Sequence, residues 1–158
     1  MIKLMATRAL ADSAMAHSTN AVLDDRRGSG LSHPPRYTVR LARSAADIRA
    51  AQTLRFLVFN LELNEGLPQS FDTCLDEDPF DPVCDHLVAE ETATGEIVGT
   101  YRLQTGSNAL ARLGYYSEQE FDFAPYEPLR PVLLELGRAC VHQKHRNLTG
   151  RPRSRLRD

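Results

Sequence analysis

Hydrophobic and β-branched residues run almost without a break from Val132 to Val141, a pattern typical of a strand buried on both faces. Two charged residues, Glu135 and Arg138, interrupt this run. Strict strand alternation places them on opposite faces, so each is expected to find its own buried partner or to line a cleft. A basic turn follows the strand, and such a turn suits an anionic group such as a phosphate. Its residues are His142, Lys144, His145 and Arg146.

The pattern before residue 64 predicts one strand and one long helix. Alternating apolar positions indicate a strand over Tyr37–Leu41, and Ser44, followed three residues later by an acid, is a suitable N-cap. The helix is predicted from about Ala45 to Leu63. Arg55 and Glu62 fall on its apolar stripe, seven residues apart. They are expected either to pair at the edge of the core or to face a substrate.

An acidic segment rich in Pro and Gly, residues 64–85, is predicted to be a loop. Its acids are Glu65, Asp72, Asp76, Glu77, Asp78, Asp81 and Asp85. One interpretation is a recognition loop in which Asp76, Asp78 and Asp81 hold a cationic amine. The alternative is a loop whose charges face water, outside the core. The spacing of its acids does not fit an EF-hand calcium loop.

The third part of the pattern is a hairpin followed by a short helix. Residues 86–91 and 96–104 are predicted strands joined by a tight turn, with Arg102 either on the hairpin surface or in the same cleft as Arg138. Ser117 is a predicted N-cap. This order of elements predicts an α/β (α+β) fold with a mixed, largely antiparallel sheet flanked by helices.

Composition narrows the class of protein. A chain of 158 residues, 42% hydrophobic and without an apolar run long enough to span a bilayer, predicts a soluble single domain. Three cysteines and no secretory signal favour a reducing cytoplasm. Residues 1–35 are expected to be a disordered leader, 36–149 the folded domain and 150–158 a basic tail.

Several motifs together resemble one known family. They are Arg55-x-x-Val58-Phe59, Asp76-x-Asp78-x-Phe80-Asp81, Arg102 and Glu135-x-x-Arg138. The chain resembles the ornithine N-acyltransferases, a hemolysin-like group of GNAT-like enzymes related to the autoinducer synthases. Longer strings, such as GYYSEQEFDF and ELGRACVH, resemble the same group. The chain has no Trp, which autoinducer synthases carry soon after the first motif, and this argues against that branch.

The resemblance implies transfer of a long acyl chain from an acyl carrier protein to an amine such as that of ornithine. It suggests Glu135, Arg138 and Arg102 as catalytic residues. Substrate-binding candidates are Arg55, Glu62, Asp76, Asp78 and Asp81, and acyl-donor-binding candidates are Val141, His142, Lys144, His145 and Arg146. No cofactor or metal is expected beyond the acyl donor, which is acyl carrier protein or coenzyme A. Expected partners are the carrier protein and a small amine, with peripheral contact to the inner membrane and no nucleic acid.

Members of this superfamily continue past the basic turn into a helix and a further strand, whereas Gly150 to Asp158 cannot form an amphipathic helix. The chain is therefore expected to be truncated at its C-terminus, with the sheet open at one edge. Three alternatives stay open: an autoinducer synthase-like enzyme, an inactive remnant that only binds a carrier protein, and a metal-binding module. The metal-binding module would use Cys84-x-His86 and Cys140-x-His142 as ligand pairs.

Overall fold

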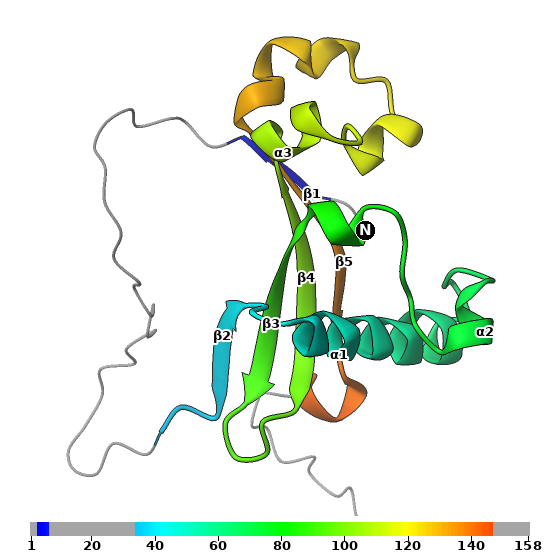
Figure 1. Cartoon of the computed structure of the whole chain (residues 1–158), viewed down its shortest axis with the longest axis vertical. Helices are drawn as coiled ribbons and strands as arrows, with labels where there is room; N and C mark the ends of the chain where they lie inside the picture. The colour runs from blue at the N-terminus through cyan, green and yellow to red at the C-terminus, as the bar shows by residue number, and fades with distance from the viewer. Residues whose placement is uncertain (1–2, 7–33, 147–158) are drawn as a thin grey trace, which may run out of the picture.

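Strands dominate the computed structural model, which describes residues 3–6 and 34–146. Within these residues five strands form one antiparallel sheet in the order β1-β5-β4-β3-β2 (Figure 1). The strands are β1 (Lys3–Ala6), β2 (Tyr37–Leu41), β3 (Asp85–Glu91), β4 (Ile97–Thr105) and β5 (Leu133–Val141). The predicted mixed α/β fold with an antiparallel sheet, including the hairpin of β3 and β4, is confirmed.

The prediction that residues 1–35 form a disordered leader is wrong for residues 3–6. Residues 3–6 form β1, which pairs antiparallel with β5. As a result β5 has a hydrogen-bonded neighbour on each side, and the expected open edge at β5 is not observed at the paired residues. The rest of the leader and the predicted basic tail, 150–158, lie outside the described residues.

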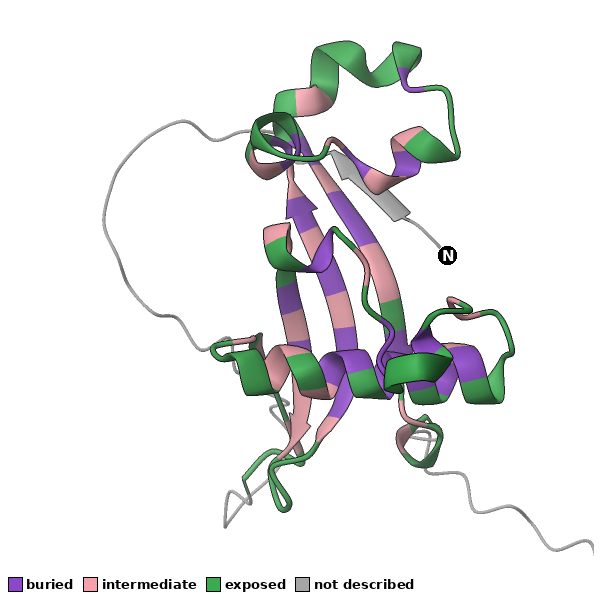
Figure 2. Ribbon diagram, turned by 45° about the vertical axis from the view of Figure 1, so that its right-hand side comes forward, coloured by how far each residue is buried: buried purple, intermediate pink, exposed green. Residues whose placement is uncertain are grey.

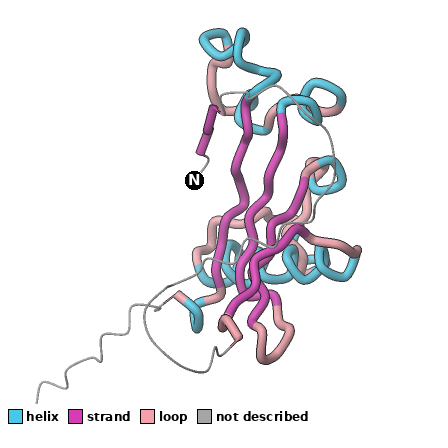
Figure 3. The backbone as a smooth tube through the Cα atoms, turned by 90° about the vertical axis from the view of Figure 1, so that its left-hand side faces the viewer, coloured by secondary structure: helices cyan, strands magenta, loops and turns pink. Residues whose placement is uncertain are grey.

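Helices occupy one face and one end of the sheet. They are α1 (Ala45–Arg55), η1 (Phe56–Glu62), α2 (Ser70–Thr73), η2 (Asp81–Val83), α3 (Gly106–Ala111), η3 (Tyr116–Gln119), η4 (Ala124–Val132) and η5 (Gln143–His145). Helix α1 crosses the strands, while α3, η3 and η4 gather at one end of the sheet (Figures 1 and 3). None of the described helices combines the length and apolarity needed to cross a bilayer.

The start of α1 is held by local hydrogen bonds, as its sequence predicted. The Ser44 hydroxyl accepts a hydrogen bond from the Asp47 backbone N–H at 3.2 Å, which confirms the N-cap. Arg40 of β2 donates two hydrogen bonds to the Asp47 carboxylate, at 2.8 and 3.0 Å, and two to Glu90 of β3, at 3.0 and 2.7 Å. This arrangement joins the first turn of α1 to two strands, and it lowers the pKa of the Asp47 carboxyl.

The second half of the predicted helix has a different hydrogen-bond pattern. Helical backbone continues to Glu62, but Phe56–Glu62 is a π-helix, in which the Leu63 N–H reaches back to the Val58 carbonyl at 3.0 Å. The wider turn is followed by a close approach at Gly66. A side chain at Gly66 would collide with Asn60, because a Cβ there would lie 1.9 Å from Asn60 Oδ1. Glycine therefore allows the chain to turn directly beneath η1.

The main core lies between α1 and the sheet, where burial is concentrated (Figure 2). Its fully buried members include Ala51, Leu54, Val58, Val88 and Val98. A second cluster, made of Ala109, Tyr115, Phe123 and Leu133, joins the end helices to β5. The prediction that β5 is buried on both faces is wrong at its end, because Val141 is 42% exposed.

The helix predicted to begin at Ser117 also differs. The short 3-10 helix η3 begins at Tyr116, and its cap residue is Tyr115, whose N–H donates to the Glu118 carboxylate at 2.8 Å. Ser117 lies inside the helix, where its hydroxyl donates a hydrogen bond to Glu135. Ser117 therefore bonds to Glu135 of the distant strand β5 instead of capping its own helix.

Replacing Ser44 by Ala should lower the free energy of unfolding by about 1 kcal/mol, because the orphan N–H groups of the first turn of α1 lose their side-chain acceptor. Urea titration of both proteins measures the difference. Ser44→Asp keeps an acceptor and should unfold near the wild-type midpoint. An unchanged midpoint in Ser44→Ala would show that the cap contributes nothing.

Candidate active site

A buried ion network lies beside the point where α1 becomes π-helical. Arg55 is 0% exposed, and its Nε donates to Asp76 Oδ1 at 3.0 Å while its Nη2 donates to Asp81. Neither arrangement considered for Arg55 is observed, because Arg55 is buried away from solvent and Glu62 lies at the surface, where it pairs with Arg146. Arg55 instead ties α1 to the acidic segment across 21 residues of sequence.

The acidic segment is not a solvated loop at the three aspartates singled out from the sequence. Asp76 and Asp81 are 0% and 3% exposed, and Asp78 is largely buried. Arg102 of β4 donates to Asp78 at 2.6 Å and to Asp81 at 2.9 Å. Three arginines and three aspartates thus neutralise one another, since Arg138 also faces Asp76 and Asp78. The expectation that these aspartates lie outside the core is wrong.

Protonation in the network depends on burial and on the number of cations close to each acid. Burial raises the pKa of the Asp76 carboxyl, although Arg138 and Arg55 oppose that shift. Burial also disfavours charge on Asp81, but the attraction of Arg55 and the hydrogen bonds from Arg55 and Gln52 outweigh it and lower the pKa of Asp81. Asp81 is therefore the firmly ionised centre of the network.

A β-bulge in β5 changes which side chains face α1. Thr100 of β4 pairs with Cys140, but Arg102, two residues later, pairs with Gly137, so β5 carries one extra residue. Arg138 lies at this bulge with a left-handed backbone, φ 51°. Its side chain turns to the α1 side, where it lies over the Phe59 ring. The predicted placement of Glu135 and Arg138 on opposite faces is therefore wrong, because alternation breaks between them.

Glu135 is fixed by hydrogen bonds rather than by an arginine. One carboxylate oxygen accepts from the Ser117 N–H at 2.8 Å and from the Ser117 hydroxyl, and the other accepts from the Tyr116 N–H at 2.9 Å. Glu135 is paired with Gln104 on the neighbouring strand β4. The three donors hold the carboxylate in one orientation.

A polar pocket of about 400 Å³ lies beside the ion network and Glu135. Its walls bring together Arg102, Arg138 and Glu135, as the sequence interpretation of a shared cleft for the two arginines predicted. The remaining lining residues are Phe59, Glu65, Gln104, Tyr116, Glu120, Phe121, Gly137 and Ala139. Gln104 was not singled out as a site residue, although its place on the same face as Arg102, two residues along the strand, was a usable signal.

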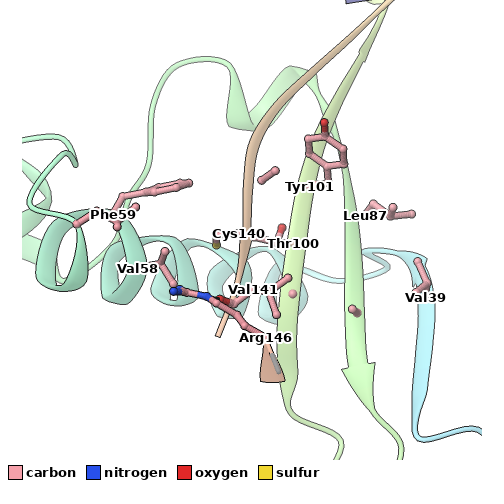
Figure 4. Close-up of a pocket in the computed structure, with 13 residues that line it drawn as sticks. Val39, Val58, Phe59, Leu87, Thr100, Tyr101, Cys140, Val141 and Arg146 are labelled. Atoms are coloured by element: carbon pink, nitrogen blue, oxygen red, sulfur yellow. Dashed lines mark hydrogen bonds between the residues drawn. The ribbon is translucent and has the colours of Figure 1, made fainter. Parts of the chain in front are cut away.

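A second pocket, of about 580 Å³, is almost entirely apolar (Figure 4). Val39, Leu87 and Tyr101 line it from the sheet face opposite α1, and Val58 and Phe59 line it from η1. The two pockets share Phe59 and Ala139. They therefore meet at the bulge of β5 and at the π-helix, two irregular stretches of backbone that face each other.

The basic turn after β5 forms the short helix η5. The Tyr37 hydroxyl and His145 Nδ1 lie 2.9 Å apart, and Arg146 donates to the Val141 carbonyl at 2.7 Å and to Glu62. Arg146 and Val141 also line the apolar pocket. The turn is thus anchored to both β2 and η1.

Two of the three cysteines lie close to the site, and Cys140 lines the apolar pocket. Burial raises the pKa of both Cys84 and Cys140 to about 12, which keeps them as thiols. In the part of the chain that the structure describes, no three His, Cys, Asp or Glu side chains are grouped to hold a metal ion. The geometry gives no support to the Cys/His module considered from the sequence.

Comparison with known proteins identifies the family of this chain. A family model described as Acetyltransferase (GNAT) domain matches residues 54–151, and the chain belongs to that family. The chain is 40% identical over 119 residues to the L-ornithine N(alpha)-acyltransferase of Rhodobacter capsulatus, and 43% identical over 122 residues to that of Brucella abortus. These matches cover 72% and 69% of this chain.

A similar protein of the same name from Rhizobium meliloti is 35% identical over 153 residues, or 92% of this chain. The chain spans only about half the length of such relatives, since the matches cover 46%, 42% and 51% of the three proteins. No solved structure gives a significant match.

Replacing Asp81 by Asn should destabilise the fold by about 3 to 5 kcal/mol, because Arg55 and Arg102 would be left buried without their shared counter-charge. Urea or thermal unfolding followed by circular dichroism measures the loss. Asp72→Asn, at an exposed acid in the same segment, should change stability by less than about 0.5 kcal/mol. Equal effects of the two substitutions would contradict the structural role of the network.

The same pairing predicts an acid limit. Because the folded-state pKa of Asp81 is lowered, its contribution to stability is complete above about pH 4, the ordinary range of an Asp carboxyl, and is lost as pH falls through the lowered value. The stability difference between wild type and Asp81→Asn should therefore shrink in that acid range. A difference that stays constant there would contradict the assignment.

Proposed function

We propose that this chain carries the amine-binding and acyl-binding parts of an N-acyltransferase that transfers an acyl group from acyl carrier protein to the α-amine of L-ornithine. The observation that carries the proposal is that a polar pocket and an apolar pocket meet at Phe59 and Ala139. One pocket suits a small zwitterion and the other an acyl chain, so their junction is where amine and thioester would react. The relatives named L-ornithine N(alpha)-acyltransferase support this choice of acceptor.

The acceptor would bind on the α1 side. Arg138 is the cation best placed to bind its carboxylate, because its distances to Asp76 and Asp78 are long, 3.4 and 3.6 Å, and its side chain is 16% exposed. Arg102 Nη1 donates to both Asp78 and Asp81, and Arg102 would act through the positive potential it adds. Arg55 and the three aspartates would act indirectly, by holding the two pocket arginines in place.

Glu135 would orient the amine rather than remove its proton. Its carboxylate already accepts three hydrogen bonds, and this leaves little capacity for proton transfer but fixes a negative charge beside the amine. In the reaction the neutral amine nitrogen attacks the thioester carbonyl carbon. A carbon–nitrogen bond forms, the carbon–sulfur bond breaks, and the proton lost by nitrogen neutralises the leaving thiolate.

The acyl chain would occupy the apolar pocket, with the thioester at the bulge. The turn after β5 would meet the donor, because His142, Lys144 and His145 lie next to Val141 and Arg146, which line that pocket. Arg146 is already paired with Glu62, so its role would be to brace the turn against η1. Lys144 is the cation of this group left to attract an acidic carrier.

The direct test is mass-spectrometric detection of N-acylornithine after incubation of the protein with acyl-acyl carrier protein and L-ornithine. Formation of the amide, dependent on both substrates, is the expected result. A protein that binds neither substrate and forms no amide would contradict the proposal.

Arg138→Lys should lower kcat/KM for L-ornithine about tenfold or more, because an ammonium cannot reproduce bidentate binding of a carboxylate. Unfolding should change little, since Arg138 is partly exposed and its ion pairs are long. Lys also retains the side chain needed to cover Phe59. Unchanged kcat/KM would remove Arg138 from acceptor binding.

Lys144→Glu should weaken binding of acyl carrier protein several-fold at low salt and have a smaller effect at high salt, because it reverses charge at the proposed docking turn. Arg112→Glu, an exposed charge reversal just after α3 at the other end of the sheet, is the matched control and should leave binding unchanged. Fluorescence anisotropy with labelled carrier protein measures both. The same change in both variants would show that only net charge matters.

A further inference from the structure

The polar pocket contains groups whose hydrogen-bonding capacity is unused. Gln104 is 2% exposed, and its Nε2 donates to the Gly114 carbonyl at 2.9 Å. Its Oε1 has no hydrogen-bond partner among the described residues. The amide cannot turn to satisfy Oε1 without losing the bond to Gly114, so a residue that lines the pocket keeps a buried acceptor without a partner.

Two carboxylates at the pocket are also without a counter-ion. Glu65 and Glu120 are exposed lining residues, and neither forms an ion pair with any described residue. The nearby acid Glu118 differs, because Arg130 binds it at 2.8 Å. Glu135 differs too, since backbone and hydroxyl donors occupy both of its oxygens. The unused negative charge of the pocket therefore belongs to Glu65 and Glu120.

Taken together, the pocket offers one loosely held cation at Arg138, one buried amide carbonyl and two unpaired carboxylates. They complement a molecule with one carboxylate and two amino groups. We propose that Gln104 Oε1 accepts a hydrogen bond from the attacking amine, and that Glu65 and Glu120 select an acceptor with a second, side-chain ammonium. This inference rests on the proposed function and adds three residues that determine its specificity.

Matched ligands separate the two parts of the inference. L-norvaline has the carbon skeleton, carboxylate and α-amine of L-ornithine but lacks the side-chain amine. Isothermal titration calorimetry on the whole chain should show L-ornithine binding about tenfold more tightly, as expected for loss of one or two partly exposed charge contacts. In Glu65→Gln/Glu120→Gln, L-ornithine affinity should fall to that of L-norvaline, while L-norvaline affinity should stay within about twofold of wild type.

Glu96→Gln serves as the control for charge, because Glu96 is an exposed acid in the turn between β3 and β4, outside the pocket. It should leave the tenfold preference unchanged. A preference that survives in the double variant, or that disappears equally in Glu96→Gln, would overturn the role of Glu65 and Glu120.

Gln104 needs a pair of variants, since any replacement risks losing the bond to Gly114. Gln104→Met removes both the donor and the acceptor, and should weaken L-ornithine and L-norvaline about equally, by roughly three- to tenfold. Gln104→Glu also loses the donor to Gly114 but keeps an acceptor, so it should bind both ligands at least as well as wild type. Circular dichroism confirms that each is folded.

Equal binding by Gln104→Met and Gln104→Glu would overturn the role of Gln104, because the two differ in the acceptor and share the loss at Gly114. If wild type binds L-ornithine and L-norvaline equally, the selectivity assignment fails while the proposed function stands. If wild type binds neither amino acid, the proposed function fails, and this inference fails with it.

Discussion

Arg55 has no exposed surface, and a guanidinium in that position needs negative charge at contact distance. Asp76 and Asp81 supply it, and they can do so only if residues 76–81 fold back against the end of α1. Asp81 then also accepts from Arg102, which draws β4 into the same network. One buried cation thereby sets the relative positions of a helix, a long connection and the central hairpin. The pocket arginines are placed by this constraint before any substrate is considered.

The irregular stretches of backbone lie where the two pockets meet. The π-helix η1 carries Phe59, and the bulge of β5 carries Arg138 and Ala139. A regular α-helix and a regular strand would turn one or more of these side chains away from the shared wall, because both periodicities are strict. Each irregularity costs backbone stability locally, and such costs recur at functional sites. Here they bring a polar and an apolar cavity into contact.

The two pockets differ in how many polar groups line them and in whether those groups already have hydrogen-bond or ion-pair partners. In the apolar pocket the lining is aliphatic or aromatic apart from Gly99, Thr100, Cys140 and Arg146, so it would select a ligand mainly by shape. In the polar pocket both carboxylate oxygens of Glu135 accept hydrogen bonds, whereas Gln104 Oε1, Glu65 and Glu120 have no such partner among the described residues. Satisfied groups give a site its rigidity, and unsatisfied ones give it something to bind. This contrast separates the residues that keep the site rigid from the residues that can bind a ligand.

Local patterns in the sequence were sufficient for the order of β2, α1, the β3–β4 hairpin and β5, for the Ser44 cap and for the antiparallel α/β class, but they missed β1. The family resemblance grouped Arg102, Arg138 and Glu135 as site residues, and they line one pocket, although alternation had placed Glu135 and Arg138 on opposite faces. Tertiary structure decided which charges pair. Arg55 bonds to Asp76 and Asp81 instead of Glu62, Ser117 bonds to Glu135 instead of capping its helix, and the bulge turns Arg138 to the α1 side. These outcomes depend on burial and on contacts between distant segments, and alternation or helical periodicity carries no information about either.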